Sequence, residues 1–63
     1  MSMPNLTTKE LTALEDLLGA EQVMVKKYRT MASQCTDNQL KSSYENIANR
    51  HQQHYDTLAN HLN

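Results

Sequence analysis

The sequence predicts an all-α protein, an antiparallel two-helix hairpin that dimerises into a ferritin-like four-helix bundle. Three observations predict this fold class. The 63 residues include one glycine, one proline and neither phenylalanine nor tryptophan, which argues against a turn-rich β fold. Two helix-start signals of the same design divide the chain. After each signal, apolar side chains recur in steps of three and four residues, the spacing of one helix face.

The first helix is expected over about residues 8–34. Thr7 stands three residues before Glu10, so its hydroxyl can accept a hydrogen bond from the Glu10 N–H while the Glu10 carboxylate accepts one from the Thr7 N–H. This reciprocal pair is a capping box. Residues 1–6 are expected to form a flexible N-terminal segment. The row of side chains expected to pack against the other helix, called here the seam, consists of Leu11, Leu14, Leu18, Glu21, Val25, Tyr28 and Ala32.

The second helix is expected over about residues 37–62. Thr36 and Gln39 have the same capping-box spacing as the first pair. Asp37 as the cap is the rival interpretation, and it moves the boundary by one residue. The seam of this helix is Leu40, Tyr44, Ile47, His51, His54, Leu58 and His61.

A single domain (residues 1–63) of this length buries too little surface to be very stable alone. Cys35 is the one cysteine, so no disulfide framework can form within the chain. Metal binding and self-association remain as sources of stability. Further apolar residues beside each seam make the apolar surface of both helices wider than the two helices can bury against each other. We therefore expect a two-fold symmetric homodimer.

Three seam positions carry residues that packing alone does not explain: Glu21, His51 and His54. Glu21 precedes Thr36 by 15 residues and His51 follows it by 15, so an antiparallel hairpin brings them to the same height. A second copy would add its own three residues to this layer. Carboxylate and imidazole groups together predict a divalent-metal site for iron, zinc or manganese, with Tyr28, Tyr44 and Tyr55 as supporting hydrogen-bond partners.

The favoured interpretation of the same three residues is nevertheless a buried polar layer without metal, which fixes the register and number of helices, and the metal site is the alternative. His61 is expected to interact with the C-terminal end of its helix. Cys35 is either a packing contact with Leu40 or a link to another chain. Gly19 leaves room either for another helix or beside Glu21.

Composition excludes several classes of function. The formal net charge is −1 with scattered Lys and Arg, so neither a nucleic-acid surface nor a membrane surface is expected. No apolar run is long enough to span a bilayer. The first residues lack the features of a signal peptide, and the single cysteine favours a reducing, intracellular setting. With no nucleophile–base pair, phosphate loop or CxxC motif, any enzyme activity would be redox chemistry of the metal layer.

The stretches from Gly19 to Tyr28 and from Ala48 to His54 resemble the helical pair of the ferritin-like, rubrerythrin-type family. That family binds a di-iron centre through a Glu on one helix and a Glu-x-x-His motif on the next. The resemblance matches Glu21 to the first Glu and His54 to the motif His. His51 stands where the motif has Glu, which favours a more nitrogen-rich site or none.

A closer resemblance, from about Thr8 to Leu62, is to small spore coat proteins of the coat F type. It is carried by Thr8-Lys9-Glu10-Leu11, by Gln34-Cys35-Thr36-Asp37 and by Gln52-Gln53-His54-Tyr55. These proteins are half-bundle relatives of the ferritin-like fold in spore-forming Firmicutes. The resemblance implies a structural or assembly protein of the spore coat, with other coat proteins as partners.

Overall fold

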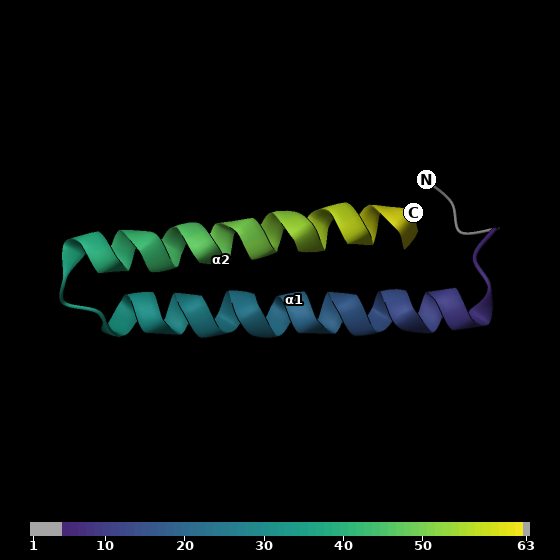
Figure 1. Cartoon of the computed structure of the whole chain (residues 1–63), viewed down its shortest axis with the longest axis horizontal. Helices are drawn as coiled ribbons and strands as arrows, with labels where there is room; N and C mark the ends of the chain where they lie inside the picture. The colour runs from purple at the N-terminus through teal and green to yellow at the C-terminus, as the bar shows by residue number, and fades with distance from the viewer. Residues whose placement is uncertain (1–4, 63) are drawn as a thin grey trace.

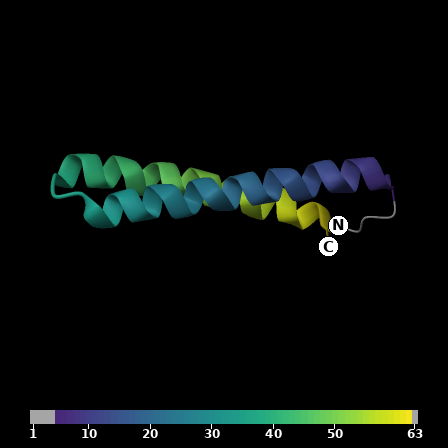
Figure 2. The same ribbon diagram turned by 90° about the horizontal axis from the view of Figure 1, so that it is seen from below.

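The computed structural model describes residues 5–62, so residues 1–4 of the predicted N-terminal segment lie outside the described part. Two helices, α1 (Thr8–Gln34) and α2 (Asn38–Ala59), run antiparallel and side by side, and a 3-10 turn, η1 (Asn60–Leu62), follows α2. Figure 2 shows that they cross at a shallow angle. The hairpin is elongated, with extents of 47 × 17 × 11 Å. The prediction of two packed helices is confirmed.

The start of α1 is the predicted capping box. The Glu10 N–H donates to the Thr7 hydroxyl at 3.0 Å, and the Thr7 N–H donates to Glu10 Oε1 at 3.0 Å. Both otherwise unpaired N–H groups are therefore satisfied at the exposed end of the helix. The helix ends at Gln34, and the Cys35 N–H donates to the Ala32 carbonyl at 3.2 Å.

The start of α2 differs from the favoured prediction. Asp37 is the N-cap, and its carboxylate accepts the Leu40 N–H at 2.7 Å. A Thr36–Gln39 box is therefore wrong and the rival interpretation is correct, because an aspartate is at least as good a cap as threonine. The α-helix also ends earlier than residue 62. In the 3-10 turn that completes it, His61 Nδ1 lies 3.2 Å from the Thr57 carbonyl oxygen.

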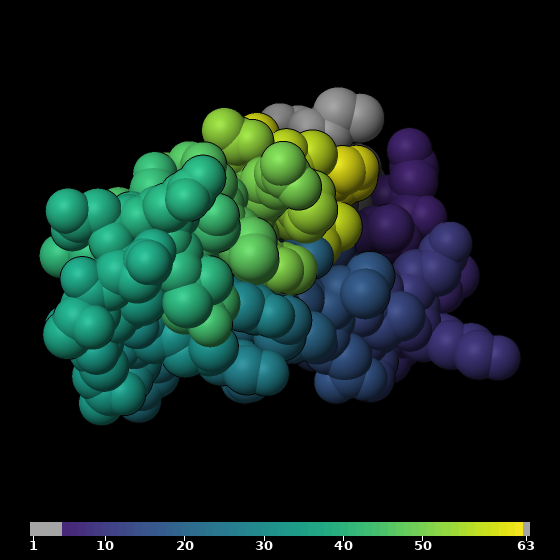
Figure 3. All heavy atoms as spheres, turned by 60° about the vertical axis from the view of Figure 1, so that its left-hand side comes forward, coloured from purple at the N-terminus to yellow at the C-terminus, as the bar shows by residue number. Residues whose placement is uncertain are grey.

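The core between the helices is thin. Figure 3 brings the turn end forward and shows side chains filling the space between the helices. Large apolar side chains remain exposed at Leu17 (52%), Val23 (65%) and Leu40 (45%). A Cβ added to Gly19 would meet nothing within 4 Å, so no neighbour among residues 5–62 requires this glycine. Within residues 5–62, the buried residues are Leu14, Leu18, Val25, Ala32 and Ala48.

The two long sides of the hairpin differ in chemistry. One side, called here the histidine face, has a hollow of about 360 Å³ lined by Leu17, Glu21, His54, Thr57 and Leu58. Steps of three and four residues place further side chains on this face. The opposite side has a hollow of about 370 Å³ with a mixed lining, in which Gln22, Arg29 and Gln52 lie beside Val25 and Tyr55. The histidine face consists of Leu17, Glu21, Met24, Tyr28, Met31, Tyr44, Ile47, His51, His54 and Leu58.

Neither helix, over residues 5–62, has a segment that is both long and apolar enough to cross a membrane.

Candidate metal centre

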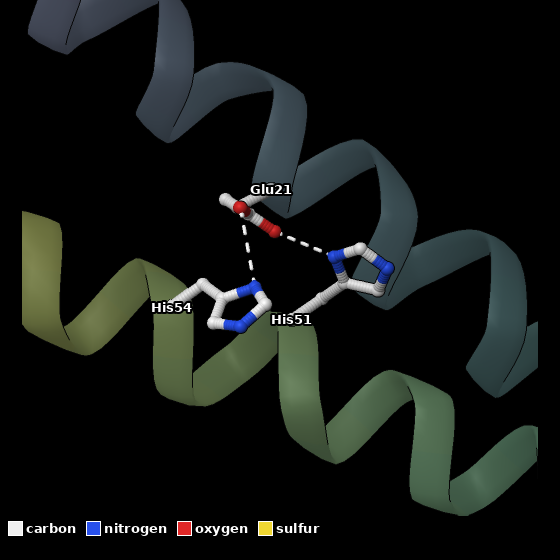
Figure 4. A network of polar contacts seen from close by, with 3 residues as sticks. All are labelled: Glu21, His51 and His54. Carbon is white, nitrogen blue, oxygen red and sulfur yellow. Dashed lines mark hydrogen bonds and ion pairs between the residues drawn. The ribbon is translucent and has the colours of Figure 1, made fainter.

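The hairpin turn sets the height of the three predicted site residues. Glu21 lies near the middle of α1, while His51 and His54 lie one turn apart on α2. The short turn at residues 35–37 aligns these positions, as their equal distance from Thr36 predicts. Figure 4 shows the Glu21 carboxylate between the two imidazole rings. The predicted layer is therefore present within one chain.

Each carboxylate oxygen of Glu21 faces a different histidine. Glu21 Oε1 lies 2.6 Å from His51 Nδ1, and Glu21 Oε2 lies 3.5 Å from His54 Nδ1. One potential ligand atom from each residue can be chosen so that all three lie within 4.8 Å of one another. The arrangement needs two helices, because no local segment of the sequence contains all three groups.

The three side chains differ in exposure. The Glu21 and His51 side chains are 20% and 24% exposed, whereas that of His54 is 60% exposed. The expectation that all three are buried in the core therefore fails for His54 in the single chain. Its position lies at the outer edge of the α1–α2 contact, where the single chain leaves it open to solvent. No sequence pattern distinguishes this edge from the centre of the seam.

Aromatic side chains support His51 from one side. The Tyr28 ring stacks on the His51 ring with an interplanar angle of 7° and centroids 6.3 Å apart. Tyr44 packs against Tyr28 with ring centroids 6.0 Å apart. The two tyrosines therefore restrict the His51 ring by packing. Tyr55 is not part of this group: its hydroxyl accepts from the Gln22 amide at 3.5 Å, beside the hollow on the opposite side.

Lys27 is a neighbour of the site that the sequence pattern did not single out. It is exposed to solvent, and its ammonium group lies 5.5 Å from the centroid of the Tyr28 ring, which is cation–π distance. Its position directly beside Tyr28 on the helix was the available signal.

The chemistry of the donor set fits a divalent transition metal. Two imidazole nitrogens and one carboxylate oxygen are ligands that zinc, iron and manganese accept, with coordination positions left open. In the chain without metal, a proton held between Glu21 Oε1 and His51 Nδ1 joins the two groups at 2.6 Å. A metal ion bound by both atoms would replace that proton.

Comparison with known proteins identifies a relative of this chain. No protein-family model matches the chain, and no solved structure matches it. The uncharacterized protein YuzM of Bacillus subtilis is 33% identical over 57 residues, which cover 90% of this chain and 70% of the relative. Identity at this level over most of both chains indicates common descent, and the chain belongs to the same protein family as YuzM.

Proposed function

We propose that this chain is a homodimeric metal-binding protein of the ferritin-like type. Glu21, His51 and His54 of each copy bind a divalent transition-metal ion, which is iron, zinc or manganese. The observation that carries this proposal is the convergence of three ligand-capable side chains, from two helices, within 4.8 Å. The protein would store, buffer or redox-cycle the ion.

Exposed apolar surface supports the dimer. Leu17 is 52% exposed on the histidine face, next to the hollow that Glu21 and His54 line. Burial of such a surface against a second copy removes it from water and contributes about 25 cal/mol per Å² of apolar area. It would also cover His54, which is 60% exposed in one chain. A second copy supplies another carboxylate and two more imidazoles to the same layer.

The donor set indicates a nitrogen-rich site. His51 contributes a neutral nitrogen where the resembling family has a carboxylate, so α2 offers no bridging oxygen between two ions. Each chain would therefore hold its ion through two nitrogens and one oxygen. Because metal binding displaces the proton between Glu21 and His51, affinity should fall as the pH is lowered.

Metal analysis of protein purified without a His-tag tests the proposal. We expect the wild-type protein to carry a divalent transition metal in stoichiometric amounts, and a His51→Ala, His54→Ala double variant to carry none. His61→Ala is the matched control. His61 lies in η1, where its ring contacts the Thr57 carbonyl of α2, and it does not belong to the cluster. The control should retain the metal of the wild-type protein.

Substoichiometric metal in both the wild-type and the double-variant preparations contradicts metal binding. Equal loss of metal in a His61→Ala control that keeps its helical circular dichroism spectrum contradicts the assignment of His51 and His54 as the ligands.

The second candidate is a structural role as an assembly module of the spore coat. In this role, Glu21, His51 and His54 form a polar layer without metal. The 2.6 Å contact of Glu21 with His51 favours this role, because it satisfies both groups without an ion. The resemblance to coat F proteins supports the location. Mass spectrometry of the coat fraction of spores from the source organism, against the mother-cell fraction, tests it: absence from the coat contradicts this role.

A further inference from the structure

We propose that the two copies meet with α1 against α1, antiparallel, and that Lys27 of each copy pairs with Asp16 of the partner subunit. This inference rests on the dimer of the proposed function and adds its orientation. It assigns roles to three residues outside the metal cluster: Asp16, Ala20 and Lys27.

Two arrangements bring two histidine faces together with two-fold symmetry and all six ligands in one layer. With the two-fold axis parallel to the bundle, α1 lies beside α2 of the other copy. With the axis perpendicular to the bundle, at the height of Glu21, α1 lies beside the other α1 and runs in the opposite direction. The apolar residues of the histidine face fit either arrangement, so the charged residues at its edge decide between them.

Asp16, Ala20 and Lys27 form one stripe along the edge of α1. They are separated by four and seven residues, the spacing of neighbours on one side of a helix. The cation–π contact of Lys27 with Tyr28 fixes the place of this stripe, because Tyr28 stacks on His51 of the cluster. The stripe therefore borders the histidine face.

In the α1–α1 arrangement, residues equally far from the two-fold axis in opposite directions face each other. Asp16 lies five residues before Glu21 and Lys27 lies five residues after Gln22. With the axis midway between Glu21 and Gln22, Lys27 of one copy faces Asp16 of the partner subunit, and the symmetry makes this contact twice. Ala20, next to the axis, is small enough for the two backbones to approach closely.

In the α1–α2 arrangement, the same stripe meets no opposite charge. Glu21 is then level with His51 and His54 of the partner subunit, so the stripe runs along the edge of the other α2. Asp16 faces Thr57 of the partner subunit, and Lys27 faces Asn46 of the partner subunit. Arg50, the nearest charged residue on that edge, would repel Lys27. Charge complementarity therefore favours pairing of α1 with α1.

Disulfide cross-linking tests the orientation directly. In a Cys35→Ser background, Ala20→Cys places a thiol beside the proposed axis, within reach of its symmetry mate. Gly19→Cys is the matched control, since it lies one residue away, in open space, on the side of α1 that faces away from the proposed contact. After mild oxidation, non-reducing electrophoresis should show a covalent dimer for Ala20→Cys and only background for Gly19→Cys. Equal cross-linking of the two variants, or none for Ala20→Cys, overturns the orientation.

A charge exchange is the second test. Lys27→Glu and Asp16→Lys each place like charges together at both contacts, and each should raise the dimer dissociation constant about fivefold at low salt. The double variant, and a mixture of the two single variants, should recover wild-type affinity. Single variants that dimerise like the wild type overturn the pairing but leave the metal-binding dimer standing. A wild-type protein that sediments as a monomer with and without zinc overturns both proposals.

Discussion

Glu21 shows how a charged side chain is accommodated on a packed helix face. Taking a carboxylate out of water is costly unless hydrogen bonds replace the lost hydration. Its side chain is 20% exposed, and each oxygen faces an imidazole, at 2.6 Å and 3.5 Å. Spacing along the chain was enough to predict this partnership. The exposure of His54 was not predictable, because it depends on the angle at which α2 presents that side chain.

A pH prediction belongs to Glu10, at the exposed start of α1. Hydrogen bonds from the Thr7 N–H, and then from the Thr7 hydroxyl, hold the pKa of the Glu10 carboxyl below its ordinary value of 4.5. A lowered pKa in the folded state means that the stabilisation is present above about pH 4.5 and is lost as the pH falls through the folded-state value. The melting temperature of the wild type should therefore approach that of Glu10→Gln under acid conditions.

Thermal melts of both proteins from pH 7 to pH 3 measure this difference. Glu15→Gln is the control, since Glu15 lies on the same helix outside the capping box. A melting-temperature gap between wild type and Glu10→Gln that stays constant over the whole range would contradict the role of the charged carboxylate.

At the scale of the helix, the sequence predicts α1 more closely than α2. For α1, one capping box stands next to the apolar repeat, and the helix begins at Thr8 as expected. For α2, two cap candidates lie side by side at Thr36 and Asp37. Capping preferences differ by only a few tenths of a kcal/mol between such residues, so spacing alone could not decide. The carboxylate that reaches the Leu40 N–H decides it.

The α2 cap yields a matched pair of variants. Asp37→Ala removes the acceptor of the 2.7 Å hydrogen bond from the Leu40 N–H and should lower the free energy of unfolding by about 1 kcal/mol. Thr36→Ala, one residue earlier, should change it by less than about 0.5 kcal/mol. Urea denaturation followed by circular dichroism gives both values. A larger loss for Thr36→Ala than for Asp37→Ala would restore the rejected cap.

At the scale of the whole molecule, the periodicity of the seams and the position of the turn were enough to predict the hairpin. They also predict the height at which Glu21 meets His51. Periodicity does not predict which helix of a second copy lies beside α1, because the same apolar stripes fit both arrangements. That choice depends on isolated charges such as Asp16 and Lys27, whose energies are small compared with that of the apolar surface.

The proposed dimer would make stability depend on protein concentration, since unfolding of a dimer also dissociates it. We expect the melting temperature to rise with concentration. Leu17→Glu should abolish this dependence, because Leu17 is already 52% exposed in one chain and its replacement affects the histidine face far more than the hairpin core. Asn49→Glu is the control for the introduced charge. Asn49 is exposed and lines a hollow with Arg29 on the side of the hairpin opposite the histidine face.

Sedimentation equilibrium and melts at two concentrations, about tenfold apart, distinguish the variants. Loss of a buried leucine contact and introduction of a charge should raise the dissociation constant of Leu17→Glu by at least about tenfold, which corresponds to roughly 1.4 kcal/mol. Asn49→Glu should stay within about twofold of the wild type. If both variants weaken association equally, the contact surface is not confined to the histidine face. Association weakened by Asn49→Glu alone would place the second copy on the opposite side of the hairpin, away from the metal ligands.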